Sequence, residues 1–141
     1  MNDQWVSFSL AGEKYAHPVS SIKEVLLYQE PSPVPGAPCD VDGILNIRGE
    51  VLTVISARKL MNLPDDPQAE DSRILSIETN DGLCGIVVDN VEAIVGFEQA
   101  NIDPPPNPDT KGVIQGTIHR EGELFIVANF LPHCEGVARE M

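Results

Sequence analysis

Positively charged residues are scarce in this chain of 141 residues. It contains nine Lys and Arg against 22 Asp and Glu, which gives a formal net charge of −13 at pH 7. Nucleic-acid binding requires clustered cations that replace the counterions of the phosphates, and the only adjacent cationic pair is Arg58-Lys59. We therefore expect no binding of nucleic acid or of anionic membranes, and we interpret the acidity as a source of solubility.

Cysteines and long apolar runs are also few. Cys39, Cys84 and Cys134 are widely spaced and form no Cys-x-x-Cys pair, so we expect three free thiols and neither a disulfide framework nor a zinc site. No apolar run approaches the roughly 20 residues of a membrane helix, and residues 1–5 lack the features of a secretory signal. The sequence therefore predicts a cytoplasmic protein without direct insertion into a membrane.

Motifs of catalysis and of cofactor binding are missing as well. The chain has no phosphate-loop, dinucleotide, zinc-protease or serine-hydrolase motif. Cys84 is the best candidate nucleophile, but it shares a predicted strand face with Ile86 and Val88, which favours a buried thiol that acts as a small hydrophobic group. We predict no catalytic residue, no cofactor and no metal site.

Two other polar segments have ordinary interpretations. His133-Cys134 could form half of a metal site, but a solvent-exposed pair near the C-terminus is the favoured interpretation. Asp89 ends an apolar strand, and a carboxylate at such a place more often orders the turn that follows than takes part in catalysis.

The residues that are abundant predict β-structure. Aromatic residues make up only 5% of the chain, and the apolar positions are mostly Val, Ile and Leu, which favours strands. We expect strands at 6–10 and 15–19, hairpins at 43–56, 73–89 and 113–129, and a short helix at 57–63. Pro18 suggests an edge strand, and the capping-box spacing of Ser21 and Glu24 suggests a helical turn that begins at Ser21.

Two proline-rich loops, 31–38 and 103–109, and an acidic proline-containing connector, 64–71, divide the chain. Each half shows a glycine turn, a strand, a proline loop and a second glycine, with Gly12 and Gly43 in the first half and Gly82 and Gly112 in the second. This weak repeat predicts one domain, 1–141, with two small β-lobes at about 1–63 and 72–141. This prediction allows terminal strands from one lobe to cross into the other.

Arg48 is the best candidate for a recognition residue. It stands before Gly49 at the tip of the hairpin expected at 43–56, and Arg is enriched at interface hot spots. The alternative is a solvated cation paired with Glu50. The residues alone leave both interpretations open.

Taken together, these segments resemble the CheW-like family of bacterial chemotaxis coupling proteins over about residues 5–131. In the first half the resemblance is carried by Gly12-Glu13-Lys14-Tyr15-Ala16, Pro18-Val19, Ile22, Glu24-Val25, Pro33-Val34-Pro35-Gly36-Ala37-Pro38, Gly43-Ile44, Asn46-Ile47-Arg48-Gly49, Val51-Leu52 and Val54-Ile55. In the second half it is carried by Gly85-Ile86-Val87-Val88-Asp89, Val91, Ile102 and Pro104-Pro105-Pro106.

The resemblance implies an all-β fold of two five-stranded, SH3/OB-like β-barrels that share a core. It also implies a non-catalytic adaptor that couples methyl-accepting chemoreceptors to a CheA-type histidine kinase, with one surface for the helical receptor tip and another for the regulatory domain of the kinase. By position, the receptor-facing surface would include Ile22, Glu24, Gly43, Arg48, Gly85, Val91 and Ile94. The kinase-facing surface cannot be placed residue by residue. Association with receptor arrays is expected.

Two positions depart from the family pattern. Thr53 stands where a proline is usual, and Ser56 stands where an aspartate is usual, although serine can still cap the helix expected at 57–63. These changes do not threaten the fold, and they keep open the alternative of a divergent scaffold in a pilus-type chemosensory or polar-localisation complex, with the chemotaxis adaptor still favoured.

Overall fold

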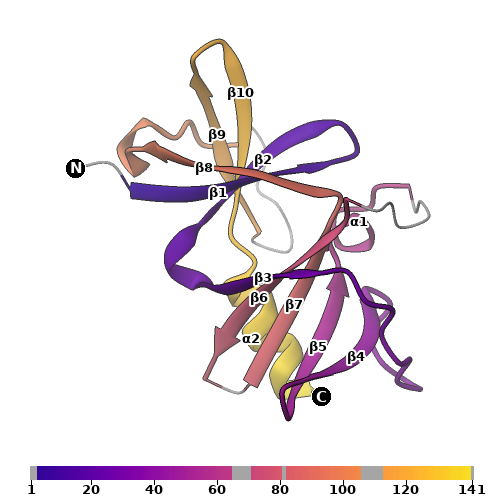
Figure 1. The fold of residues 1–141 in the computed structure, drawn as a ribbon. Helices are drawn as coiled ribbons and strands as arrows, with labels where there is room; N and C mark the ends of the chain where they lie inside the picture. The colour runs from indigo at the N-terminus through magenta and orange to yellow at the C-terminus, as the bar shows by residue number, and fades with distance from the viewer. Residues whose placement is uncertain (1–2, 65–70, 81, 106–112, 141) are drawn as a thin grey trace.

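The computed structural model describes residues 3–64, 71–80, 82–105 and 113–140. Within these residues, ten strands form two five-stranded sheets (Figure 1). The strands are β1 (Asp3–Leu10), β2 (Glu13–Pro18), β3 (Ile22–Leu27), β4 (Val41–Ile47), β5 (Glu50–Ser56), β6 (Arg73–Thr79), β7 (Gly82–Val88), β8 (Asn90–Phe97), β9 (Ile114–Arg120) and β10 (Glu123–Ala128). The helices are α1 (Ala57–Leu60) and α2 (Leu131–Glu140), with 3-10 turns η1 (Val19–Ser21) and η2 (Gln99–Asn101). Neither α-helix is long and apolar enough to cross a membrane.

The first sheet, which we call the terminal sheet, has the order β8-β1-β2-β10-β9, and the second, the central sheet, has the order β3-β6-β7-β5-β4. The all-β fold with two five-stranded units is therefore confirmed. The sheets differ from the approximate lobes 1–63 and 72–141. The central sheet takes the continuous segment from β3 to β7, whereas the terminal sheet joins the first two strands to the last three. Of the connector 64–71, residues 65–70 lie outside the described residues.

The two sheets repeat the same arrangement of strands. Replacing β3, β4, β5, β6 and β7 by β8, β9, β10, β1 and β2 converts the order of the central sheet into that of the terminal sheet. Gly43 and Gly116 occupy corresponding places: both have φ of +149°, and a Cβ on either would collide with a backbone carbonyl, that of Ser32 or Asp103. These carbonyls belong to isolated bridges with Ile44 and Thr117 that continue the sheets into the preceding loops. The two sheets therefore repeat one arrangement in which Gly116 is the counterpart of Gly43. Gly112, the counterpart expected from the sequence, lies outside the described residues.

One hydrophobic core lies between the sheets. Phe8 and Tyr15 of the terminal sheet pack there with Ile55 and Ile86 of the central sheet and with Phe130, which precedes α2. Each curved sheet also encloses a smaller hydrophobic cluster of its own. That of the terminal sheet includes Trp5 and Phe125, and that of the central sheet includes Leu52 and Val54.

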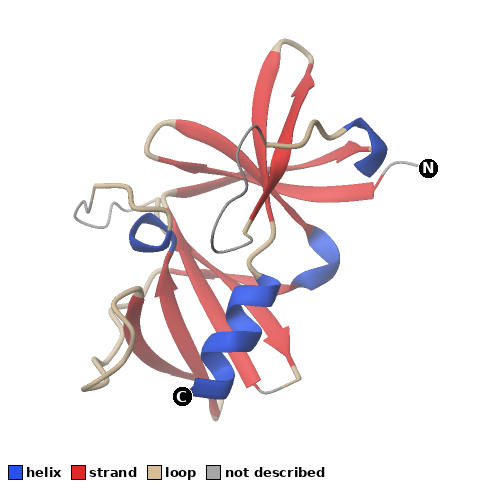
Figure 2. Cartoon of the chain, turned by 180° about the vertical axis from the view of Figure 1, so that it is seen from behind, coloured by secondary structure: helices blue, strands red, loops and turns tan. Residues whose placement is uncertain are grey.

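Helix α2 follows the last strand of the terminal sheet and packs against β6 and β7 of the central sheet (Figure 2). The sequence did not predict it, and the expectation that His133-Cys134 is solvent-exposed is wrong. Cys134 is fully buried in the shared core, and Nε2 of the mostly buried His133 lies 2.7 Å from Oδ2 of Asp40. Helix α2 therefore joins the two sheets from one side.

Several local expectations are confirmed and others are corrected. The three expected hairpins form as β4–β5, β6–β7 and β9–β10, and Ser56 caps α1 by accepting a hydrogen bond from Lys59 N at 3.3 Å. Pro18 does not mark an edge strand, because β2 lies between β1 and β10 and Pro18 is its last residue. The helical turn η1 ends at Ser21 instead of beginning there, and Glu24 belongs to β3.

Candidate functional site

Arg48 lies at the exposed tip of the β4–β5 hairpin, as the sequence predicted. Arg48 and Gly49 have φ of +51° and +86°, the left-handed pair that a two-residue hairpin turn needs. Gly49 N donates a hydrogen bond to Asn46 Oδ1 at 3.0 Å, which fixes the turn from inside the hairpin. The turn therefore holds the Cα–Cβ direction of Arg48 rigidly, although its side chain is 67% exposed.

The guanidinium of Arg48 forms an ion pair with Glu24 of β3. Strands β3 and β4 are the two edges of the central sheet, so this pair spans the seam where the curved sheet closes. The sequence-based alternative, a pair with Glu50, is wrong, because Glu50 instead lies 3.7 Å from Lys23 Nζ. An exposed pair of this kind stabilises a fold by less than about 1 kcal/mol, which leaves its charges available to a partner.

The predicted residues Val91 and Ile94 lie on the other sheet, in β8. Ile94 is 63% exposed, one of the large apolar side chains left in contact with solvent. Val91 is half-buried and packs against the shared core, as does Ile22 of β3. The predicted set is therefore divided between the two sheets: Glu24 and Arg48 are brought together on the central sheet, and Ile94 is presented by an edge strand of the terminal sheet.

The two predicted glycines, Gly43 and Gly85, are buried. A Cβ on Gly85 would lie 2.6 Å from Cγ2 of Ile74 and 2.9 Å from Cδ2 of Leu52, so this position faces the interior of the central sheet. Gly43 faces the backbone of Ser32, as described above. Neither can offer a side chain to a partner, and any effect on binding must pass through the shape of the central sheet.

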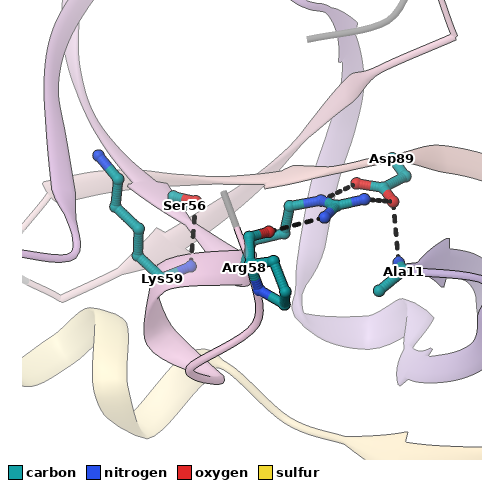
Figure 3. Close-up of polar contacts among 6 residues, drawn as sticks. Ala11, Ser56, Arg58, Lys59 and Asp89 are labelled. Atoms are coloured by element: carbon teal, nitrogen blue, oxygen red, sulfur yellow. Dashed lines mark hydrogen bonds and ion pairs between the residues drawn. The ribbon is translucent and has the colours of Figure 1, made fainter. Parts of the chain in front are cut away.

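A polar network that the sequence did not predict connects the sheets (Figure 3). Arg58 of α1 donates from Nε to Asp89 Oδ1 at 2.9 Å and from Nη2 to Asp89 Oδ2 at 2.6 Å. Asp89 Oδ2 also accepts a hydrogen bond from Ala11 N at 2.9 Å. Partial burial would raise the pKa of Asp89, but the hydrogen bonds from Arg58 and Ala11 outweigh it and hold the pKa below its ordinary value. Asp89 therefore orders a turn, as the sequence suggested, but it is the distant β1–β2 turn and not the turn that follows Asp89 in the chain.

Cys84, the candidate nucleophile, and the buried His17 have structural roles. Cys84 is buried beside Cys134, and the hydrogen bond between the thiols together with burial raises the pKa of Cys84, which disfavours the reactive thiolate. His17 is fully buried, with Nε2 accepting a hydrogen bond from Phe130 N at 3.0 Å and Nδ1 placed to donate to Pro18 O at 3.0 Å. Among the described residues, no three His, Cys, Asp or Glu side chains are grouped so that they could hold a metal ion.

Comparisons with known proteins agree with the resemblance seen in the sequence. The family model of the CheW-like domain matches residues 4–131. The chemotaxis protein CheW of Bacillus subtilis is 30% identical over 126 residues, which cover 87% of this chain and 81% of that protein. The chemotaxis protein CheW of Helicobacter pylori is 33% identical over 103 residues, which cover 73% of this chain and 62% of that protein.

A solved structure has the same fold. The crystal structure of the scaffolding protein TtCheW from Thermoanaerobacter tengcongensis superposes with a TM-score of 0.83 at 28% identity and covers 92% of each chain. The family match spans both sheets, so it includes the Arg48–Glu24 seam, the Arg58–Asp89 network and β8. The chain belongs to the CheW-like domain family.

Proposed function

We propose that this protein is a non-catalytic adaptor of bacterial chemotaxis that couples the cytoplasmic tips of methyl-accepting chemoreceptors to the regulatory domain of a CheA-type histidine kinase. The observation that carries this is the family match over residues 4–131, with relatives named as chemotaxis proteins and a structural neighbour named as a scaffolding protein. An adaptor of this kind works in the cytoplasm at receptor arrays.

The receptor-facing surface of this proposal combines the Arg48–Glu24 seam with Ile22, Val91 and Ile94, while Gly43 and Gly85 shape the central sheet from within. An amphipathic helix is recognised through its apolar face, which lies against apolar groups of the partner, and charged groups beside that contact add specificity. The ion pair supplies the charges and Ile94 supplies an exposed apolar contact.

The decisive experiment compares Arg48→Ala with the parent protein for binding to a purified receptor-tip fragment. Loss of a charged hydrogen bond at an interface weakens binding by about 1–3 kcal/mol. The melting temperature should hardly change, because the side chain is exposed and surface substitutions stay within about 0.5 kcal/mol. Affinity can be measured by calorimetry and stability by thermal unfolding on the same preparation.

Arg120→Ala is the matched control, since Arg120 precedes the β9–β10 turn of the terminal sheet and its guanidinium pairs with the exposed, adjacent Glu121 at 3.8 Å. Equal affinity of Arg48→Ala and the parent would remove Arg48 from the receptor-facing surface. Capture of partners from the native cytoplasm then separates the two adaptor roles: chemotaxis receptors and kinase support the proposal, and pilus-type or polar-localisation components support the alternative.

A further inference from the structure

Asp89 occupies the one-residue link between β7 of the central sheet and β8 of the terminal sheet. Its carboxylate is held from both sides: by Arg58, which follows β5 of the central sheet, and by the backbone of Ala11 in the β1–β2 turn of the terminal sheet. Its own backbone N also donates to Ser9 O of β1 at 3.1 Å. The crossing point of the chain is thus fixed to both sheets (Figure 3).

The geometry of this group, which we call the inter-sheet clasp (Arg58, Asp89 and Ala11), is restrictive. Two guanidinium nitrogens contact the two carboxylate oxygens, and this fork fixes the plane of the carboxylate as well as its distance. Arg58 Nη1 also donates to Pro64 O at 2.8 Å, which holds the guanidinium itself. The Arg58 side chain is only 16% exposed, in contrast to that of Arg48, so its ion pair is less screened by solvent.

The residues proposed to face the receptor lie on both sides of the clasp. Glu24 and Arg48 belong to the central sheet, whereas Val91 and Ile94 belong to β8, which begins directly after Asp89. A partner that contacts both groups binds tightly only if their relative position is already correct, because ordering them on binding would cost free energy. A rotation at Asp89 would change that position without altering either group.

We propose that the inter-sheet clasp is a positioning element that sets the orientation of the terminal sheet relative to the central sheet, and through it the affinity for partners that contact both. Arg58 and Asp89 act through the arrangement of the sheets and do not themselves touch the partner. The part that concerns partner affinity rests on the proposed function, whereas the part that concerns orientation does not.

Orientation can be measured directly by pulsed electron paramagnetic resonance. Spin labels are placed at Val51→Cys in β5 and Leu124→Cys in β10, both exposed and on different sheets, in a Cys39→Ser background that removes the exposed native thiol. Arg58→Ala should shift or broaden the distance distribution. Lys59→Ala is the matched control. Lys59 is adjacent to Arg58 in α1, and its ion pair with Asp42 of β4, at 2.8 Å, does not connect the two sheets. The distance distribution of Lys59→Ala should therefore match that of the parent.

Binding to the receptor-tip fragment is measured on unlabelled variants at a temperature where each is shown to be folded. Arg58→Ala should weaken binding roughly 2- to 30-fold, the range of substitutions that act at a distance. Arg58→Lys should fall between it and the parent, since lysine keeps the charge but lacks the fork. Arg48→Ala should weaken binding without changing the distance distribution.

An unchanged distance distribution in Arg58→Ala would overturn the clasp as the element that sets the orientation of the sheets. A changed distribution with undiminished affinity would overturn its role in partner affinity. If the parent protein does not bind the receptor fragment, the proposed function fails in its stated form, and the distance distributions alone then decide whether the clasp sets the orientation.

Discussion

His17 shows how a single residue can make the stability of this protein depend on pH. Burial lowers its pKa to about 4, against an ordinary value near 6.5, so the ring is neutral in the folded state at pH 7. Between pH 6.5 and 4 the unfolded chain binds the proton and the folded chain does not. The free energy of unfolding must therefore fall as pH falls through this window, by about 3 kcal/mol for the full shift.

Urea unfolding at a series of pH values between 7 and 4 tests this expectation. His17→Gln should be less stable than the parent at pH 7, because the hydrogen bond to Phe130 N and the ring stacking on Phe130 are disturbed, but its stability should depend less on pH. His119→Gln is the control, since His119 is exposed, and its pH profile should follow that of the parent. A His17→Gln profile as steep as the parent's would assign the acid sensitivity to other groups.

Individual residues also show where sequence reasoning stops. The hairpin-tip position of Arg48 was predictable, because Gly49 after a run of alternating residues indicates a two-residue turn. Its partner Glu24 was not, since β3 and β4 meet only when the sheet curves. Asp89 was likewise recognised as a turn-ordering carboxylate, but its partners were not. Arg58 and Ala11 lie 31 and 78 positions away in the sequence, and only the fold brings them to Asp89.

At the scale of elements, buried glycines define how closely loops and strands approach. Gly43→Ala should destabilise the protein more than Gly85→Ala. The added Cβ at Gly43 would meet the backbone of Ser32 at a φ that side chains rarely adopt, whereas at Gly85 it would meet the side-chain ends of Ile74 and Leu52, which can move. We expect about 1–3 kcal/mol for Gly85→Ala, the usual cost of overpacking, and a larger loss for Gly43→Ala.

Chemical denaturation of both variants measures this difference. Gly136→Ala provides the contrast, because Gly136 lies within α2 with open space around its Cα. Alanine there should raise stability by up to about 1 kcal/mol through helix propensity. A smaller loss for Gly43→Ala than for Gly85→Ala would show that the Ser32 loop yields more easily than the interior of the central sheet.

The elements that sequence reasoning found are those whose signals are local. The three hairpins have turn residues between alternating strands, and Ser56 has the spacing of a helix cap. Strand β8 was missed because its middle residues are exposed in succession and do not alternate. Helix α2 was missed because Gly136 weakens its propensity and because Pro132 was not recognised as a first-turn residue, where proline is tolerated. Burial of Cys134, a tertiary contact, stabilises the helix.

At the scale of the whole molecule, the repeat was visible in the sequence and a crossing of terminal strands was allowed for, but the strands that cross could not be named. Order along the chain suggested two lobes in succession, whereas the terminal sheet joins β1 and β2 to β8, β9 and β10. The pairing of β1 with β8 and the parallel pairing of β2 with β10 carry this exchange. Parallel neighbours cannot be joined by a tight turn, so no local signal marks them.

This exchange leads us to expect that the protein unfolds as one unit. Neither sheet can separate without exposing Phe8, Tyr15, Ile86 and Phe130, which belong to one core. Trp5, the only tryptophan, is stacked on Phe97 in the terminal sheet with ring centroids 4.5 Å apart, so its fluorescence reports that sheet. Amide resonances of Leu75 and Ile86 report the central sheet. Both probes should give the same urea midpoint, as a two-state transition requires.

Phe8→Ala makes the test stricter. Phe8 is fully buried and contacts Tyr15 and Phe130, with ring centroids 5.5 and 6.2 Å away, and its removal should lower the free energy of unfolding by about 3–5 kcal/mol. Because the cavity lies between the sheets, the midpoints reported by Trp5 and by Ile86 should decrease together. If only the Trp5 midpoint decreased, the terminal sheet would be a separate cooperative unit, and the shared core would not couple the two sheets.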